Sequence, residues 1–227
     1  MLLQFITLVM LALQSITSIT SNRLVSRTIE MSRHMLRGHS GGPSVTKHVL
    51  VPIATGSEEV EAVTIIDTLV RGGAKVTVAG VGSELTVTCS RGVKIVADCL
   101  ISDCANKSWD MIVCPGGMPG AQHLSESHTL IEILQKHAHD NKFIAAICAA
   151  PAVVLAAHGF LTNKTATCYP VSKFTAKIER YVSQRVVQDG QVITSEGPGT
   201  ALEFSLKLVQ VLYGHEKAEQ IKNEMLA

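Results

Sequence analysis

The sequence predicts an α/β domain in which a mainly parallel sheet carries helices on both faces. Two observations predict this class. Continuous apolar runs, such as residues 48–54 and 143–148, are typical of strands that are buried on both faces. Segments with helically spaced apolar residues, such as 58–73 and 201–214, alternate with these runs. In such a sheet, ligands bind at the carboxyl ends of the strands.

The first half of the domain begins with the strand at 48–54. Ser57 then starts a helix over 58–73, which has acidic residues in its first turn and is stopped by two glycines. The elements expected next are a strand over 75–81, short strands in the polar stretch that leads to 94–98, a strand over 109–117 that runs into a glycine-rich turn, and a helix over 127–140 that Asn141 ends.

The second half begins with the buried strand at 143–148. A helix over 151–158 follows, with Pro151 in its first turn and Gly159 at its end. The last expected elements are a strand over 164–169, a hairpin of strands 185–189 and 191–195 joined at Asp189-Gly190, an amphipathic helix over 201–214, and a polar helix after it.

The composition is that of a folded chain. With 227 residues, 46% of them hydrophobic, the chain is long enough to bury a core without disulfides or a metal. Disordered chains are poorer in apolar residues, so this class is excluded. The net charge of +1 gives no reason to expect nucleic acid as the main partner.

The charge is divided unevenly. Residues 1–47 carry five basic side chains and one acidic one, whereas the rest of the chain has 15 basic and 18 acidic side chains. We therefore expect residues 1–45 to be an unstructured N-terminal leader and 46–227 to be the folded domain.

The leader contains an apolar run at 2–13, which is too short for a transmembrane helix of about 20 residues. It could be a transit peptide for a plastid or mitochondrion, because it is rich in Arg, Ser and Thr and poor in acids. Alternatively, Met31 or Met35 starts a cytoplasmic short form, and secretion is a third reading. The sequence leaves these alternatives open.

Cys148 is the main candidate for chemistry. A buried strand runs directly into it and a helix opens with Pro151, so the thiol should lie on a strand–turn–helix elbow. A helix N-terminus favours negative charge, and a thiol there is expected to have a lowered pKa. The alternative is that Cys148 is a small buried hydrophobic residue, as many free cysteines are.

Two more groups point to the same sheet edge. Gly116 and Gly117 follow a strand and can present backbone N–H groups, which would form an oxyanion hole with the N–H of Ala149. Glu61 lies beside the apolar residues Val60 and Val63. A buried, protonated Glu61 could donate a hydrogen bond to the sulfur and move protons.

The other five cysteines are interpreted as structural. The chain has no C-x-x-C pair and no His at metal-ligand spacing to a Cys, so no metal site is expected. Cys99 and Cys104 are separated by four residues. Scattered cysteines of this number favour a reducing compartment.

Seven segments carry a resemblance to a known family, in the family's own order. They are GSEEVEAV (56–63), GGAKVTVAGV (72–81), CSRGVKI (89–95), PGGMPGAQHLSES (115–127), AAICAAPAVVLAAHG (145–159), ATCYP (166–170) and SEGPGTALEFSL (195–206). Through them, residues 46–227 resemble the ThiJ/PfpI superfamily, in the branch of the parkinsonism-associated deglycases. The segment ATCYP and the sequence of the domain as a whole are most similar to plant or protist members.

The resemblance implies a flavodoxin-like three-layer sandwich of the class I glutamine amidotransferase type, and a homodimer. It implies that Cys148 is the nucleophile, Glu61 the protonated acid, and Gly117 and Ala149 the oxyanion amides. It also places the loop with Pro198 beside the site and Arg91 near the dimer interface. Two departures stand out: Tyr169 replaces the His of many relatives, and Glu196 replaces an Arg.

The resemblance implies a glyoxalase III or deglycase activity on a small dicarbonyl such as methylglyoxal or glyoxal, without a cofactor. The products would be lactate or glycolate. Peptidase activity is not expected, because Ala149 follows the nucleophile where the protease-like branch has His. The alternative function is a redox-sensing, chaperone-like stress protein that works through oxidation of Cys148.

Overall fold

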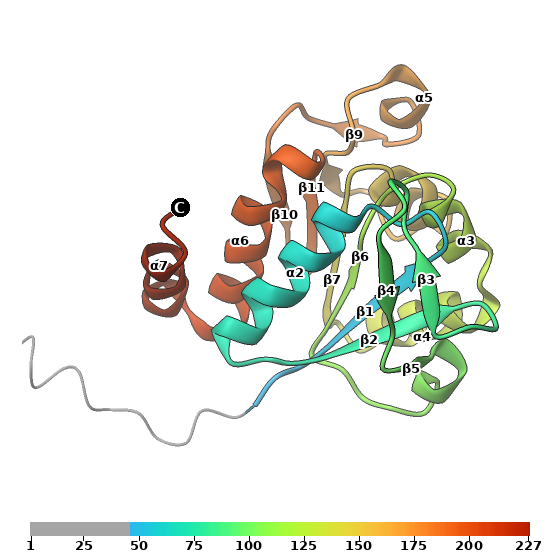
Figure 1. Ribbon diagram of the computed structural model, residues 1–227. Helices are drawn as coiled ribbons and strands as arrows, with labels where there is room; N and C mark the ends of the chain where they lie inside the picture. Colours follow the sequence, from blue (N-terminus) through green and yellow to red (C-terminus); the bar gives the residue numbers. More distant parts are fainter. Residues whose placement is uncertain (1–45) are drawn as a thin grey trace, which may run out of the picture. The chain divides into compact units, whose positions relative to one another are not determined.

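The computed structural model describes residues 46–227 (Figure 1). The predicted leader at 1–45 lies outside the described residues, so its role and the boundary at residue 45 stay predictions. None of the helices in the described part of the chain has the length and apolar character that a membrane span requires.

A seven-stranded sheet forms the centre of the fold, with the strand order β10-β11-β7-β6-β1-β2-β5. All neighbouring strands in it are parallel except the hairpin of β10 and β11. The strands are β1 (His48–Ala54), β2 (Lys75–Val81), β5 (Cys99–Leu100), β6 (Met111–Cys114), β7 (Phe143–Ile147), β10 (Val186–Asp189) and β11 (Val192–Ser195). The predicted mainly parallel α/β fold is confirmed.

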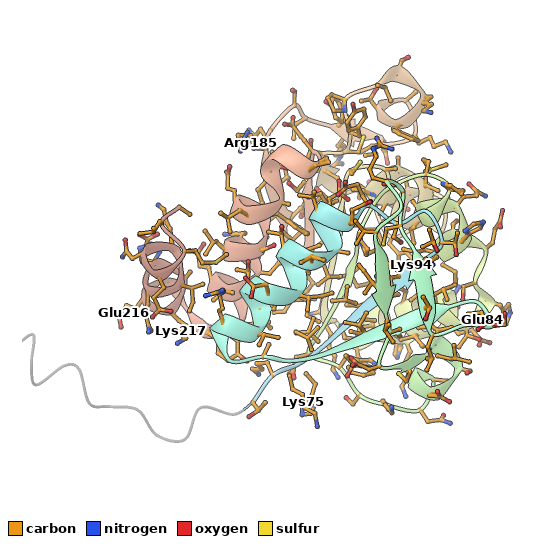
Figure 2. All side chains as sticks on the ribbon, viewed as in Figure 1. Lys75, Glu84, Lys94, Arg185, Glu216 and Lys217 are labelled. Atoms are coloured by element: carbon orange, nitrogen blue, oxygen red, sulfur yellow. The ribbon has the colours of Figure 1, made fainter. Side chains whose placement is uncertain are left out.

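Helices cover both faces of this sheet (Figure 1). On one face α2 packs against α6, and α6 packs against α7; on the other, α3 contacts α4, and α4 contacts β7. The helices are α2 (Glu59–Gly72), α3 (Gly120–Glu126), α4 (His128–His139), α5 (Ser172–Thr175), α6 (Ala201–Tyr213) and α7 (His215–Glu224). In Figure 2, charged side chains such as Lys75 and Glu216 extend from this framework into solvent.

The first strand and helix show why the sequence folds in this way. Six of the seven residues of β1 are buried, because sheet neighbours flank it on both edges and helices cover its faces. Helix α2 begins where the Glu58 side chain accepts a hydrogen bond from the Glu61 N–H at 2.7 Å. It ends at Gly73, whose φ of 100° is left-handed. The predicted helix over 58–73 is therefore confirmed.

Three segments differ from the sequence prediction. The strand expected at 164–169 is only β8 (Thr165–Ala166), which pairs with β9 (Arg180–Tyr181) outside the main sheet. The helix expected at 151–158 is the shorter π-helical segment η2 (Pro151–Ala156). The polar stretch forms a separate hairpin of β3 (Thr86–Thr88) and β4 (Lys94–Val96).

Candidate active site

Three strand ends meet at one cavity. The chain leaves β1 toward Glu58, β6 toward Gly117 and β7 toward Cys148, and β1, β6 and β7 are neighbours in the sheet. The cavity has a volume of about 450 Å³. It is lined by Glu58, Ser90, Arg91, Gly117, Met118, Cys148, Ala149, Tyr169, Val171, Lys173, Phe174 and Pro198. It lies where the rule for open α/β sheets predicts a ligand site.

Cys148 adopts a backbone conformation that few non-glycine residues adopt. Its φ is 64°, in the left-handed region, at a cost of about 1–3 kcal/mol. Two backbone hydrogen bonds hold it there: the Cys148 N–H donates to Ser195 O at 3.0 Å, and its C=O accepts from the Tyr169 N–H at 2.7 Å. The predicted elbow is present, and the thiol is mostly buried but reaches the cavity.

Gly116 holds Glu61 in place. Its N–H donates to Glu61 Oε2 at 2.7 Å. This amide was predicted to bind substrate, but its hydrogen bond goes to Glu61, and Gly116 does not line the cavity. A Cβ at this position would lie 2.6 Å from the Cβ of Cys148 and 2.9 Å from Glu61 Oε2. Glycine is therefore required here by the close approach of the two candidate side chains.

Glu61 is fully buried. Burial raises the pKa of its carboxyl group from 4.5 to about 7, and the nearby Glu58 carboxylate adds to the rise against the Gly116 hydrogen bond. Its second oxygen, Oε1, is buried and has no hydrogen-bond partner among the described residues. Such an oxygen is costly as part of a carboxylate, so burial shifts the equilibrium toward the protonated form.

The pKa of Cys148 shifts in the direction opposite to the prediction. Burial, followed by the adjacent Glu61 carboxylate, raises the pKa of this thiol to about 12, although the Gly117 and Ala149 N–H groups act to lower it. The prediction of a lowered pKa from a helix N-terminus was wrong. The helix η2 is only six residues long, and burial of the thiol, with the Glu61 carboxylate as the second cause, outweighs the effect of its N-terminus.

Cys148 and Glu61 nonetheless titrate as a pair. Glu61 raises the pKa of Cys148, and a hydrogen bond with Cys148 lowers the pKa of Glu61, so the values of about 7 for Glu61 and about 12 for Cys148 depend on each other. Between these values one proton remains. When that proton is on Glu61, the sulfur is a thiolate that accepts hydrogen bonds from the amides of Gly117 and Ala149.

The structure places the other predicted site residues at the cavity wall. Tyr169 is 43% exposed and lines the cavity, as does Pro198 at the start of η3 (Pro198–Thr200). The ring of Tyr169 lies against Gly197, since a Cβ there would be 3.3 Å from it. Glu196, which stands where relatives carry an Arg, is not among the residues that line the cavity.

Several lining residues were not predicted. Lys173 and Phe174 come from the short helix α5, and the Lys173 Nζ lies 4.8 Å from the centre of the Phe174 ring. The segment has no periodic pattern that could have identified it. Ser90 and Arg91 are held at the cavity by Glu59, which accepts hydrogen bonds from Ser90 Oγ at 2.9 Å and from the Arg91 N–H at 2.8 Å.

Within residues 46–227, no three His, Cys, Asp or Glu side chains are grouped so that they could hold a metal ion.

The chain is similar to several known proteins. The chain is 47% identical over 181 residues to protein DJ-1 homolog B of Arabidopsis thaliana, covering 80% of this chain and 41% of the relative. It is 42% identical over 166 residues to the glutathione-independent glyoxalase DJR-1.2 of Caenorhabditis elegans, covering 73% and 88%. The solved structure of oxidized Toxoplasma gondii DJ-1 aligns with a TM-score of 0.78 at 46% identity, covering 80% and 98%.

The chain spans less than half the length of the two Arabidopsis relatives it matches. The model of the DJ-1/PfpI family matches residues 47–211, which include the whole wall of the cavity described above. The predicted similarity to plant and protist members is also confirmed by these relatives. The chain therefore belongs to the DJ-1/PfpI family.

Proposed function

We propose that this protein is a glutathione-independent glyoxalase of the glyoxalase III and deglycase type, which acts on methylglyoxal and glyoxal or their early adducts. The observation that carries the proposal is the contact of one thiol with a protonatable, buried Glu61 and two backbone amides. A relative named as a glutathione-independent glyoxalase, at 42% identity, supports it.

In the first proposed step, the Cys148 sulfur attacks the aldehyde carbon of methylglyoxal. The C–S bond forms, the C=O electron pair moves to oxygen, and the proton held by Glu61 passes to that oxygen, which gives a hemithioacetal. The Gly117 and Ala149 N–H groups, which act to lower the pKa of this thiol, would donate hydrogen bonds to the oxygen on the attached carbon. Each such donor contributes about 3–4 kcal/mol in other enzymes.

In the second proposed step, the Glu61 carboxylate takes the proton from the hemithioacetal carbon, the C–H electron pair forms a C=C bond, and the ketone oxygen takes up a proton, which gives an enediol. Glu61 then returns its proton to the former ketone carbon, while the hydroxyl on the sulfur-bearing carbon loses its proton and becomes the thioester C=O. This isomerisation gives a thioester of lactate, and water then cleaves the C–S bond to release lactate. Methylglyoxal plus water has the same atoms and oxidation state as lactic acid, so the reaction needs no external oxidant or cofactor. General acid–base catalysis of this kind contributes about 10²–10⁴-fold.

The test is turnover of methylglyoxal by the full chain in the absence of glutathione, with lactate as the measured product. We expect Cys148→Ser to lose the activity and Glu61→Gln to reduce kcat by about 10²-fold or more. Cys114→Ser is the matched control, because Cys114 is fully buried in β6 and does not line the cavity. Wild-type turnover in Cys148→Ser would overturn the proposal.

Redox sensing through Cys148 is the second candidate. The two amides and a protonated Glu61 could donate hydrogen bonds to sulfinate oxygens on Cys148, and the Toxoplasma relative is described as oxidized. Mass spectrometry after mild peroxide treatment tests it. If Cys148 stays reduced while other cysteines oxidise, Cys148 is not the sensor. A chaperone-like role is a separate property, which is measured as suppression of the aggregation of another protein.

We also propose that the chain forms a homodimer. Val60 and Val63 are about half exposed on one face of α2, and Val93 and Val96 of the neighbouring hairpin segment are 50% and 69% exposed. Exposed apolar groups of this kind mark an interaction surface. Sedimentation of the full chain should give the mass of two copies, and Val63→Asp should shift it toward one; a wild-type monomer would contradict the proposal.

A further inference from the structure

A second pair of reactive groups lies away from the cavity of Cys148. The Sγ atoms of Cys99 and Cys104 are 3.6 Å apart, which is the contact distance of two thiols. Cys99 is in β5, the edge strand of the sheet. Strands β2, β1 and β6 separate β5 from β7, after which Cys148 lies.

The local fold brings these two sulfurs together. Strand β5 has only two residues, and the 3₁₀ helix η1 (Ile101–Cys104) follows it directly. This tight helix turns the chain back, so Cys104 Sγ lies 3.9 Å from Leu100 O, beside the start of the turn. The Asp103 side chain accepts the Leu100 N–H at 3.2 Å and holds the same turn closed.

The two thiols differ in exposure. Cys99 is partly exposed, whereas Cys104 is fully buried. Burial, together with the hydrogen bond to Cys99, raises the pKa of Cys104 to about 12. An oxidant from solvent therefore reaches Cys99 first, and Cys104 is in place to react with the oxidised sulfur. This is the arrangement of an attacked cysteine next to a resolving one.

From this geometry we infer that Cys99 and Cys104 form a reversible intramolecular disulfide when the protein meets a peroxide. A disulfide has an S–S length of about 2.05 Å, so the sulfurs must approach each other by about 1.5 Å. The pair lies at a sheet edge, where β5 has a neighbouring strand on one side only, so this shift does not require the strands around the Cys148 cavity to move.

The reaction balances with a peroxide as the oxidant. The Cys99 sulfur attacks one peroxide oxygen, the O–O bond breaks, and Cys99 becomes a sulfenic acid while water leaves. The Cys104 sulfur then attacks the Cys99 sulfur, the S–S bond forms, and the S–O bond breaks. The leaving hydroxide takes the Cys104 proton and departs as a second water. Two electrons pass from the thiols to the peroxide.

The sequence makes the product easy to detect. Trypsin cleaves after Lys94 and Lys107, so residues 95–107 form one peptide that contains both cysteines and no other. The full chain is treated with hydrogen peroxide, denatured, alkylated and digested without a reductant. We expect this peptide to lose two hydrogen atoms and to carry no alkyl group. Dithiothreitol given before alkylation should restore both alkylation sites.

Two variants and an internal control complete the test. In Cys104→Ser, Cys99 has no resolving thiol, so the two-hydrogen loss should disappear and Cys99 should proceed to sulfinic acid. In Cys148→Ser the yield of disulfide should stay within about twofold of wild type, since the sites are separate. The peptide with Cys114, which is fully buried in β6, should remain alkylated in every sample.

Two outcomes would overturn the inference. In the first, both cysteines of peptide 95–107 stay reduced and are alkylated at peroxide doses that oxidise another cysteine of the chain. In the second, Cys99 oxidises to sulfinic acid in the wild type while Cys104 is alkylated. The glyoxalase assay is independent of both outcomes, because it depends on Cys148.

Discussion

Replacing Glu61 with Gln should remove a pH dependence from the stability of the fold. Burial raises the pKa of Glu61 from 4.5 to about 7, and one pKa unit corresponds to about 1.4 kcal/mol, which gives about 3 kcal/mol in total. The folded state holds this proton more tightly than the unfolded chain does. The stabilising contribution is therefore complete below pH 4.5 and is lost as the pH rises to about 7.

Glutamine tests this effect because it is neutral at every pH and keeps an oxygen that can accept the Gly116 N–H. Urea unfolding of wild type and Glu61→Gln should be compared at about pH 4.5 and about pH 7.5. The free energy of unfolding of wild type, relative to the variant, should fall by about 3 kcal/mol across this interval. All other titrating groups are common to both proteins and cancel in the difference.

The same pair of measurements on a Cys148→Ser background isolates the carboxyl group, because Glu61 and Cys148 titrate together. The pH-dependent difference should persist there. A difference between wild type and Glu61→Gln that stays constant over the interval would refute the assignment of a buried, protonated Glu61, and with it the proton donor of the proposed first step.

Three further changes test other parts of the structure. Gly116→Ala would place a Cβ 2.6 Å from the Cβ of Cys148, so it should lower the melting temperature and abolish methylglyoxal turnover, whereas Gly199→Ala, with nothing within 4 Å, should do neither. Glu59→Ala removes the acceptor of the Arg91 N–H, so hydrogen exchange at that amide should become faster. Phe204→Ala empties a fully buried site and should cost about 3–5 kcal/mol in urea unfolding.

The sequence predicted the order of strands and helices best where burial is complete. β1 and β7 are continuous apolar runs because neighbours cover them on all sides, and both lie where they were expected. The prediction of a strand at 164–169 was wrong in length. Apolar and polar residues alternate there, as in a strand, but only Thr165 and Ala166 pair with another strand, β9. The length of this strand depends on pairing with a distant segment, which the local sequence pattern does not show.

Glu61 was predicted to be buried for a reason that the structure contradicts. The prediction rests on the apolar neighbours Val60 and Val63, yet these are about half exposed, and the buried residues of α2 include Ala62, Ile65 and Leu69. Glu61 is on that inner face, where a carboxyl group is out of place unless it has a function or a partner. Its partner, the Gly116 N–H, is 55 residues away in the sequence.

Contacts between distant segments also explain why the pKa of Cys148 shifts in the direction opposite to the prediction. Local sequence shows a thiol before a helix, which favours a thiolate, but it does not show how deeply the thiol is buried or that Glu61 lies against the sulfur. A thiolate beside a carboxylate would place two negative charges together in a buried site. In the proposed mechanism, the sulfur is therefore a nucleophile when the proton lies on Glu61 and is not one when the proton lies on Cys148. A chain that held this thiol beside a permanently charged neighbour would keep the elbow and lose the proposed activity.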